Sequence, residues 1–185
     1  GDSKIQPVKT RFIVNGKIMF RHDDDQADYE SVLAIGRLTC LYKLRNFEPH
    51  AILISDYDKG FLTRELIWTV IRMAEARGIP CVADAKREPN FYIGSVIKGN
   101  EEYFSRHPGI GDCVMTRGSS LPIILNLTSQ IIDGRNPVSC VNHVGAGDCF
   151  AAHLALALAP TLSLEDAVGI AHSAGRAYVQ PPHTR

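Results

Sequence analysis

Hydrophobic and polar positions follow two patterns along the chain, one typical of buried strands and the other of amphipathic helices. Short continuous apolar runs end in polar residues at 50–55, 80–84, 95–98 and 112–116. Such runs predict strands that are buried on both faces of a parallel sheet. Apolar residues at helical spacing lie between and after these runs, at 28–45, 63–77, 149–159 and beyond Ser163. Alternating strands and helices predict an α/β layer architecture with a largely parallel sheet.

Two further pairs of β-prone segments predict hairpins. The first pair, 8–14 and 18–21, flanks an Asn-Gly dipeptide, which is a strong signal for a tight turn. The second pair, 122–127 and 130–133, contains Pro122 and is therefore predicted at the edge of the sheet. A last strand over 138–141 is expected to lead into a glycine-rich turn.

Capping residues predict where two of the helices begin. Thr63 precedes an apolar-periodic segment, and Ser163 with Asp166 forms a capping-box pattern before the last helix. Gly78 is expected to end the helix that begins after Thr63. The predicted buried stripe of the last helix consists of Ile170, Ala171, Ala174 and Tyr178.

Composition narrows the class of protein. The 185 residues fit one domain, and 20 basic residues balance 20 acidic ones, so no global charge favours nucleic acid or an acidic membrane. The 5 cysteines are scattered, which favours reduced thiols in a cytoplasmic protein over a disulfide framework or a zinc site. No apolar run is long enough to span a bilayer.

The glycine-rich turn carries the candidate chemistry. Gly145, Ala146 and Gly147 precede a helical pattern, so their backbone N–H groups are expected at a helix N-terminus, where an anion such as phosphate binds well. Asp148 follows as a carboxylate beside that anion hole. The pairing suits phosphoryl transfer, with Asp148 taking the proton of a hydroxyl. An ordinary strand-to-helix turn with a first-turn acid is the alternative.

Other polar residues lie where predicted strands end. They are Asp56, Lys59, Asp84, Lys86, Asn100, Thr116 and Arg117. Because the ligand crevice of a parallel α/β sheet lies at the carboxyl ends of its strands, these side chains are expected along one edge of the molecule. Strand-exit lysines such as Lys59 and Lys86 can meet a phosphate or remain solvated surface residues.

Several of these segments together resemble the PfkB/ribokinase family of carbohydrate kinases. The run N-H-V-G-A-G-D-C-F at 142–150 is similar to the family signature, and the segments at 9–11, 52–63 and 82–86 look most like the heptose-phosphate kinase branch. The resemblance implies a three-layer αβα, Rossmann-like fold with a mostly parallel sheet. It makes residues 1–185 a single domain, N-terminally truncated to roughly two thirds of the family fold. A β-hairpin at 5–25 would be a small lid.

The resemblance also implies ATP and Mg²⁺ as cofactors, a sugar or sugar phosphate as acceptor, and Asp148 as the base. Nucleotide contacts are expected from Lys98, Asn100, Thr116, Arg117, Gly118, His172 and Gly175. Acceptor or phosphate contacts are expected from Lys9, Arg11, Asp56, Lys59, Asp84 and Lys86. Glu102 is expected near the metal through water, because Tyr103 stands where the family has a glutamate.

A second hypothesis is a catalytically inactive kinase-fold domain that serves as a nucleotide-binding or dimerisation module. Two departures from the family pattern favour it: Tyr103 replaces the usual glutamate, and the N-terminal part of the family fold is missing from this sequence. Under either hypothesis a homodimer through the lid hairpin or an open sheet edge is expected, since unpaired strand edges and exposed ribbons favour association. Neither hypothesis involves nucleic acid or a membrane.

Overall fold

The computed structural model describes residues 8–15, 17–24, 30–108, 111–118, 120–125, 130–131 and 144–180. The strands are β1 Val8–Val14, β2 Lys17–Asp24, β3 Ile52–Ser55, β4 Cys81–Asp84, β5 Val96–Asn100, β6 Cys113–Arg117, β7 Ser120–Leu125 and β8 Gln130–Ile131. The helices are α1 Glu30–Asn46, α2 Arg64–Arg77, η1 Pro89–Phe91, α3 Glu101–Arg106, α4 Ala146–Leu158 and α5 Leu164–Val179. The strand predicted over 138–141 lies outside the described residues.

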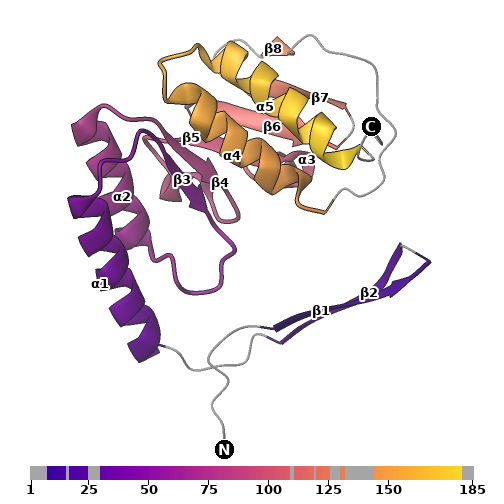
Figure 1. Ribbon diagram of the computed structural model, residues 1–185, viewed down its shortest axis with the longest axis horizontal. Coiled ribbons are helices and arrows are strands. Elements are labelled where there is room, and N and C mark those ends of the chain that lie inside the picture. The colour runs from indigo at the N-terminus through magenta and orange to yellow at the C-terminus, as the bar shows by residue number, and fades with distance from the viewer. Residues whose placement is uncertain are drawn as a thin grey trace, which may run out of the picture.

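The main sheet has the strand order β3-β4-β5-β6-β7-β8 (Figure 1). Strands β3 to β6 pair in parallel, and β7 and β8 are added in antiparallel orientation. The α/β fold with a mostly parallel sheet is therefore confirmed. Because β3 to β6 run in the same direction, their carboxyl ends meet at one edge of the sheet.

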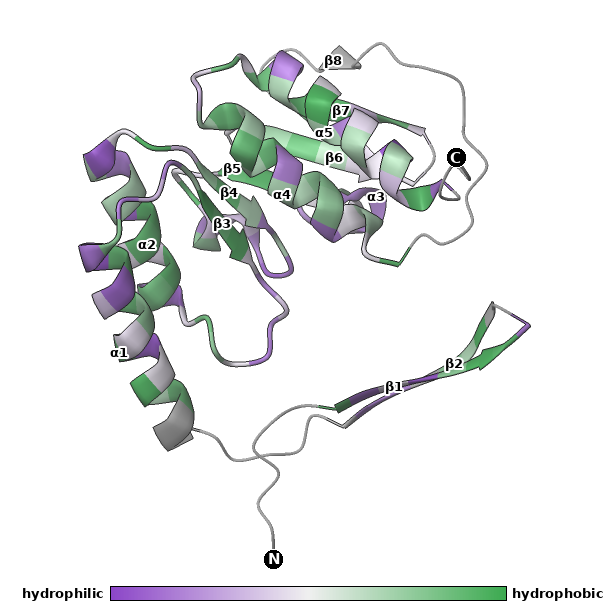
Figure 2. Ribbon diagram, viewed as in Figure 1, coloured by the Kyte–Doolittle hydropathy of each residue, from purple (hydrophilic) through white to green (hydrophobic). Residues whose placement is uncertain are grey.

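Alternate residues of the central strands face opposite helix layers. Cys81 and Ala83 of β4 pack in the core cluster that contains α2, whereas Val82 packs in the cluster with α4 and α5. This alternation follows from the period of two along a strand. Helices cover both faces, so the three-layer αβα arrangement is confirmed, and Figure 2 shows the strands between the layers as largely hydrophobic.

The predicted ends of the α2 and α5 helices are confirmed. Thr63 Oγ1 accepts a hydrogen bond from the amide of Leu66 at 3.2 Å, and Gly78 ends α2 in the left-handed conformation. Ser163 Oγ accepts from the Asp166 amide at 3.1 Å before α5. Within the described parts of the chain, no helix combines the length and apolar character that crossing a bilayer requires.

The predicted buried stripe of α5 is partly wrong. Ala171 is fully buried, but Ile170 and Tyr178 are 46% and 53% exposed. The buried face instead follows Ala167, Val168 and Ala171, because α5 packs closely along α4 and small side chains allow that approach. Tyr178 lies over the glycine turn, outside the core.

The position of Pro122 in the sheet also differs from the prediction. The predicted second hairpin is confirmed as β7 and β8 at one end of the sheet, but β7, which carries Pro122, pairs with β6 on one side and β8 on the other and is not itself the edge strand. Pro122 is fully buried and has no partner in the ladder, because the register shifts between Met115 and Arg117 at this point. A bulge is one of the few places inside a sheet where the missing N–H of proline costs no hydrogen bond.

The predicted first hairpin is confirmed, with β2 longer than expected. Strands β1 and β2 pair only with each other among the described strands, and the ribbon projects away from the main sheet (Figure 1). Its outer half carries large apolar side chains with high exposure: Phe12 53%, Ile13 61%, Val14 55%, Met19 68% and Phe20 58%. Figure 2 shows this hydrophobic end of the ribbon.

Candidate active site

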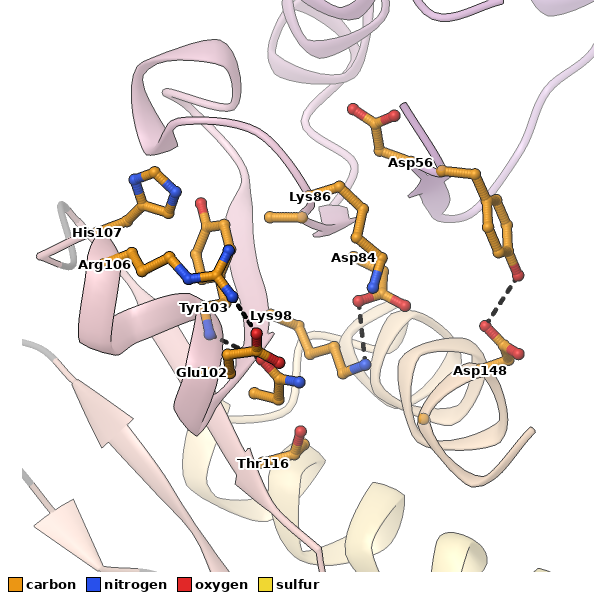
Figure 3. A pocket seen from close by; sticks show the side chains of 14 residues that line it. Asp56, Asp84, Lys86, Lys98, Glu102, Tyr103, Arg106, His107, Thr116 and Asp148 are labelled. Carbon is orange, nitrogen blue, oxygen red and sulfur yellow. Dashed lines mark hydrogen bonds and ion pairs between the residues drawn. The ribbon is translucent and has the colours of Figure 1, made fainter. Parts of the chain in front are cut away.

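A polar cavity of about 480 Å³ opens where the parallel strands end (Figure 3). The residues that line it come from the exits of β3, β4, β5 and β6, from both ends of the short helix α3 and from the first turn of α4. The predicted residues in this lining are Asp56, Asp84, Lys86, Lys98, Asn100, Glu102, Thr116, Gly147 and Asp148. The fold thus brings together most of the polar strand-exit residues that lie far apart in the sequence.

The glycine turn begins α4 at the rim of this cavity. Gly145 has φ 85°, a left-handed conformation that other residues rarely adopt, and its carbonyl accepts from the Cys149 amide at 2.8 Å. A Cβ atom on Gly147 would lie 3.2 Å from Lys98 Nζ. The amides of the first turn therefore stay open beside a lysine ammonium, which suits a phosphate group.

An ion pair lies at the base of the cavity. Asp84 and Lys98 are register partners on β4 and β5, and Lys98 Nζ lies 3.0 Å from Asp84 Oδ1. Lys98 is 6% exposed. Its ammonium carries three donors, so Asp84 can hold it in place while another donor faces Gly147.

Asp148 is exposed in the first turn of α4 and has a side-chain partner from another element. Tyr57, which follows β3, donates a hydrogen bond from Oη to Asp148 Oδ1 at 3.2 Å. Burial, the largest cause, together with the negative charges of Asp148 and Asp84 raises the pKa of Tyr57, although a hydrogen bond with Ser55 opposes this. Tyr57 therefore stays a donor at neutral pH.

A second, more apolar cavity of about 410 Å³ adjoins the first. Six of the residues predicted to contact nucleotide line it: Asn100, Thr116, Arg117, Gly118, His172 and Gly175. Both cavities share Asn100, Thr116 and Gly147. Asn100 also caps α3, since its Oδ1 accepts from the Tyr103 amide at 2.8 Å. Gly147 of the glycine turn is thus at the boundary between a polar and an apolar compartment.

The residues predicted to contact the acceptor have different surroundings. Lys86 is exposed at the first cavity, and Lys59 is exposed but lines neither cavity. Arg11 is exposed on the ribbon. Lys9, also on the ribbon, places Nζ 4.8 Å from the centre of the Tyr57 ring.

Asp56 is held by a buried network. It is 2% exposed, and its Oδ2 accepts hydrogen bonds from Arg87 Nη2 and Tyr92 Oη, both at 2.6 Å. Its Oδ1 accepts from the amide of Asp58 at 2.8 Å. With these partners, Asp56 orders the loop after β3 and has little capacity left for a substrate.

Two buried groups with raised pKa values, the Tyr92 phenol and the Cys81 thiol, predict that the protein becomes less stable at alkaline pH. Burial, and then the hydrogen bond to Asp56, raises the pKa of Tyr92 to about 12, and burial raises the pKa of Cys81 to about 12. Between about pH 9 and 12 the unfolded chain releases these protons first, so the native state binds more protons and the free energy of unfolding falls as pH rises. The slope for each group is at most about 1.4 kcal/mol per pH unit, and it approaches this limit between the pKa of the group in the unfolded chain and its raised pKa in the native state.

Urea unfolding at a series of pH values between 8 and 11 measures this loss. We expect the unfolding midpoint to fall above about pH 9. A Tyr42→Phe variant, whose ring is 70% exposed, serves as control and should follow the wild-type profile. An unchanged midpoint across this range would show that the two groups titrate normally.

Glu102, which was expected near a metal ion through water, lines the polar cavity and has a protein partner as well. It forms an ion pair with Arg106 on the surface of α3, and Tyr103 is buried with Oη donating to the Arg87 carbonyl at 2.9 Å. No cluster of three metal-binding side chains occurs among the described residues.

Sequence reasoning did not identify three residues that line the first cavity: Tyr57, Arg106 and His107. Tyr57 directly follows Asp56, which the sequence predicted to lie at a strand exit. Its position next to Asp56 is the one sequence feature that could have identified it. Arg106 and His107 end a short helix, and no sequence pattern marks them.

The chain matches known proteins in sequence. The family model described as pfkB family carbohydrate kinase matches residues 101–185. The bifunctional protein HldE of Caulobacter sp. is 30% identical over 192 residues, which cover 90% of this chain and 38% of that protein. The HldE of Caulobacter vibrioides is 27% identical over 192 residues, 90% of this chain and 39% of that protein. The chain thus spans well under half the length of these relatives.

Solved structures share the fold. Arabidopsis thaliana ribokinase, complexed with ribose and ATP, superposes with a TM-score of 0.62 at 19% identity over 78% of this chain and 53% of the ribokinase. Trypanosoma brucei brucei adenosine kinase gives a TM-score of 0.64 at 12% identity over 95% of this chain and 64% of that enzyme. The described chain therefore has the ribokinase-like fold, and its residues 101–185 match the family model of pfkB carbohydrate kinases.

Proposed function

We propose that the chain is the phosphoryl-transfer part of an ATP-dependent kinase that acts on a hydroxyl group of a sugar or sugar phosphate. The observation that carries this proposal is the position of the Gly145–Gly147 turn. It lies between an apolar cavity of nucleotide size and a polar cavity that contains Asp148. A phosphate at the turn would have the nucleoside on one side and the acceptor on the other.

The chain's own groups then have separate roles. The acceptor oxygen forms a bond to the γ-phosphorus, the bond from that phosphorus to the β–γ bridging oxygen breaks, and ADP leaves. Asp148 accepts the hydroxyl proton. The amides of the Gly145–Gly147 turn and the ammonium of Lys98 stabilise the negative charge on the moving phosphoryl group.

The donor set fits Mg²⁺ bound mainly through phosphates and water. Asp84, Glu102 and Asp148 line the polar cavity, but they do not form a preformed three-ligand cluster. Mg²⁺ typically keeps several waters and uses one or two carboxylates with substrate phosphates. When bound, the ion would neutralise phosphate charge, with Glu102 or Asp84 holding its waters.

ADP release measured with ATP and Mg²⁺ tests this function. The acceptors are heptose 7-phosphate, fructose 6-phosphate and ribose, each compared with a reaction that lacks acceptor. We expect acceptor-dependent ADP release with at least one of them. Release that does not depend on any acceptor would contradict the proposed transfer.

The alternative is a nucleotide-binding module without catalysis. The buried Tyr103 and the Glu102–Arg106 ion pair favour it, because they leave α3 without a carboxylate that points freely into the cavity. This alternative predicts that ADP stabilises the chain in a thermal-shift assay while no acceptor supports turnover.

We also propose that a second copy of the chain covers the outer half of the β1–β2 ribbon. An isolated two-stranded ribbon is marginally stable in water, and this one exposes the Phe12–Phe20 pair, whose ring centres lie 5.6 Å apart. We expect sedimentation to show dimers that dissociate in a Phe12→Ser, Phe20→Ser variant. A Trp68→Ser variant, changed at an exposed aromatic on α2, should stay dimeric. A monomeric wild-type chain would contradict the assignment.

A further inference from the structure

Tyr57 connects two parts of the molecule that the sequence keeps apart. Its Oη donates to Asp148 Oδ1 at 3.2 Å, and its ring lies beneath Lys9 Nζ at 4.8 Å from the centroid. Lys9 belongs to the ribbon, Tyr57 to the loop after β3, and Asp148 to α4. Tyr57 and Asp148 both line the polar cavity.

This contact matters because Asp148 is otherwise a short, exposed side chain at a helix start. A carboxylate there can rotate among several rotamers, and each misplacement moves the accepting oxygen away from the acceptor hydroxyl. The Tyr57 hydrogen bond engages Oδ1 and fixes the plane of the carboxylate. Oδ2 then remains available to accept a proton.

We propose that Tyr57 is the positioning residue for Asp148 and that Lys9 of the ribbon holds Tyr57 in that position. The proposal rests on the proposed function, in which Asp148 is the proton acceptor. It adds that the ribbon contributes to catalysis through one stacked side chain: when Lys9 covers the ring, Tyr57 is oriented toward Asp148. Cation–π contact of this kind orders an exposed ring.

The loop that carries Tyr57 is itself well anchored. Asp56, the preceding residue, is buried and held by Arg87 and Tyr92, and the amide of Asp58 donates to Asp56 Oδ1. Tyr57 is 49% exposed between these two anchored neighbours. Its backbone is therefore fixed while its side chain can respond to Lys9 and to a bound acceptor.

Kinetic measurements on the full chain test the catalytic part, with heptose 7-phosphate, fructose 6-phosphate or ribose as acceptor. We expect Tyr57→Phe to lower kcat about 10- to 100-fold, while KM for ATP changes less than about twofold. Lys9→Ala should lower kcat in the wild-type background but have little further effect in Tyr57→Phe. Tyr42→Phe and Lys43→Ala, changed at exposed positions of α1, are the matched controls.

Spectroscopic titration tests the contact without requiring turnover. The near-ultraviolet difference between the wild type and Tyr57→Phe isolates the ionisation of this one tyrosine. The groups facing it are Lys9 on β1, Ser55 on β3, Asp84 on β4 and Asp148 on α4. We expect Tyr57 to titrate at lower pH in Asp148→Asn, because a negative charge beside the phenol is removed.

The outcomes separate this proposal from the proposed function. An unshifted Tyr57 titration in Asp148→Asn would overturn the positioning role, whether or not the chain is active. A shifted titration with wild-type kcat in Tyr57→Phe would also overturn it while leaving the proposed function standing. Full turnover in Asp148→Asn would refute the role of Asp148 as the proton acceptor and, with it, the catalytic consequence of Tyr57, while acceptor-dependent transfer itself would stand. Absence of acceptor-dependent ADP release in the wild type would instead refute the proposed function.

Discussion

Replacing Asp148 with asparagine is expected to lower the rate of phosphoryl transfer about 10²- to 10⁴-fold. The amide keeps the size of the carboxylate and can still accept a hydrogen bond from Tyr57, but it cannot take the proton of the acceptor hydroxyl. The backbone of the anion-hole turn is unchanged, so the affinity for ATP and ADP should stay close to that of the wild type. The decrease should therefore appear in kcat.

ADP release at saturating ATP and isothermal titration with ADP measure the two quantities separately. Asp112→Asn, at an exposed aspartate just before β6, is the matched control and should keep wild-type turnover. If Asp148→Asn turned over at the wild-type rate, another group would have to accept the proton. If it lost ADP affinity to the same extent as turnover, Asp148 would instead act in nucleotide binding.

The largest expected effect on stability is that of Arg87→Met. Arg87 donates two hydrogen bonds to Asp56 Oδ2, from Nε at 2.9 Å and from Nη2 at 2.6 Å, and a third from Nη2 to the Leu62 carbonyl at 2.7 Å. Removing the guanidinium leaves a buried carboxylate without its cation. We expect the free energy of unfolding to fall by about 3 kcal/mol, at the lower end for a buried pair.

We expect a loss at the lower end of the range for buried ion pairs because the Arg87 side chain is 19% exposed, so water can partly replace it. Urea unfolding measures the change, with Arg72→Met on the exposed face of α2 as control. The double variant Asp56→Asn, Arg87→Met should lose less than the sum of the two single changes, since it leaves no unpaired charge. Strict additivity would mean that the two groups do not act as a pair.

Most secondary structure was predictable from the chain because the pattern of burial repeats locally. Continuous apolar runs indicated β3 to β6, since strands covered by helices on both faces need apolar residues at every position. The placement of Pro122 on an edge strand failed because a proline normally marks an edge. The register shift beside Met115 and the short pairing of β8, which involves only Ile123 and Ile124, make its position on β7 acceptable.

The stripe predicted for α5 failed for a related reason. Helical spacing identifies which residues share a face, but the neighbouring element decides which face is buried. Close packing against α4 selects the small residues Ala167 and Ala171, and Tyr178 is directed toward the glycine turn instead.

The sequence alone determined the glycine turn and Asp148, because a helix start with open amides and an adjacent carboxylate is set by neighbouring residues. It also placed the polar residues at strand exits. Only the tertiary structure decided which partners those residues have. Asp56, predicted to meet a substrate, is occupied by Arg87 and Tyr92, and Asp148 is contacted by Tyr57, a residue 91 positions away in the chain. Contacts between residues so far apart in the sequence depend on how the layers of the fold pack together, and a local sequence pattern does not predict that packing.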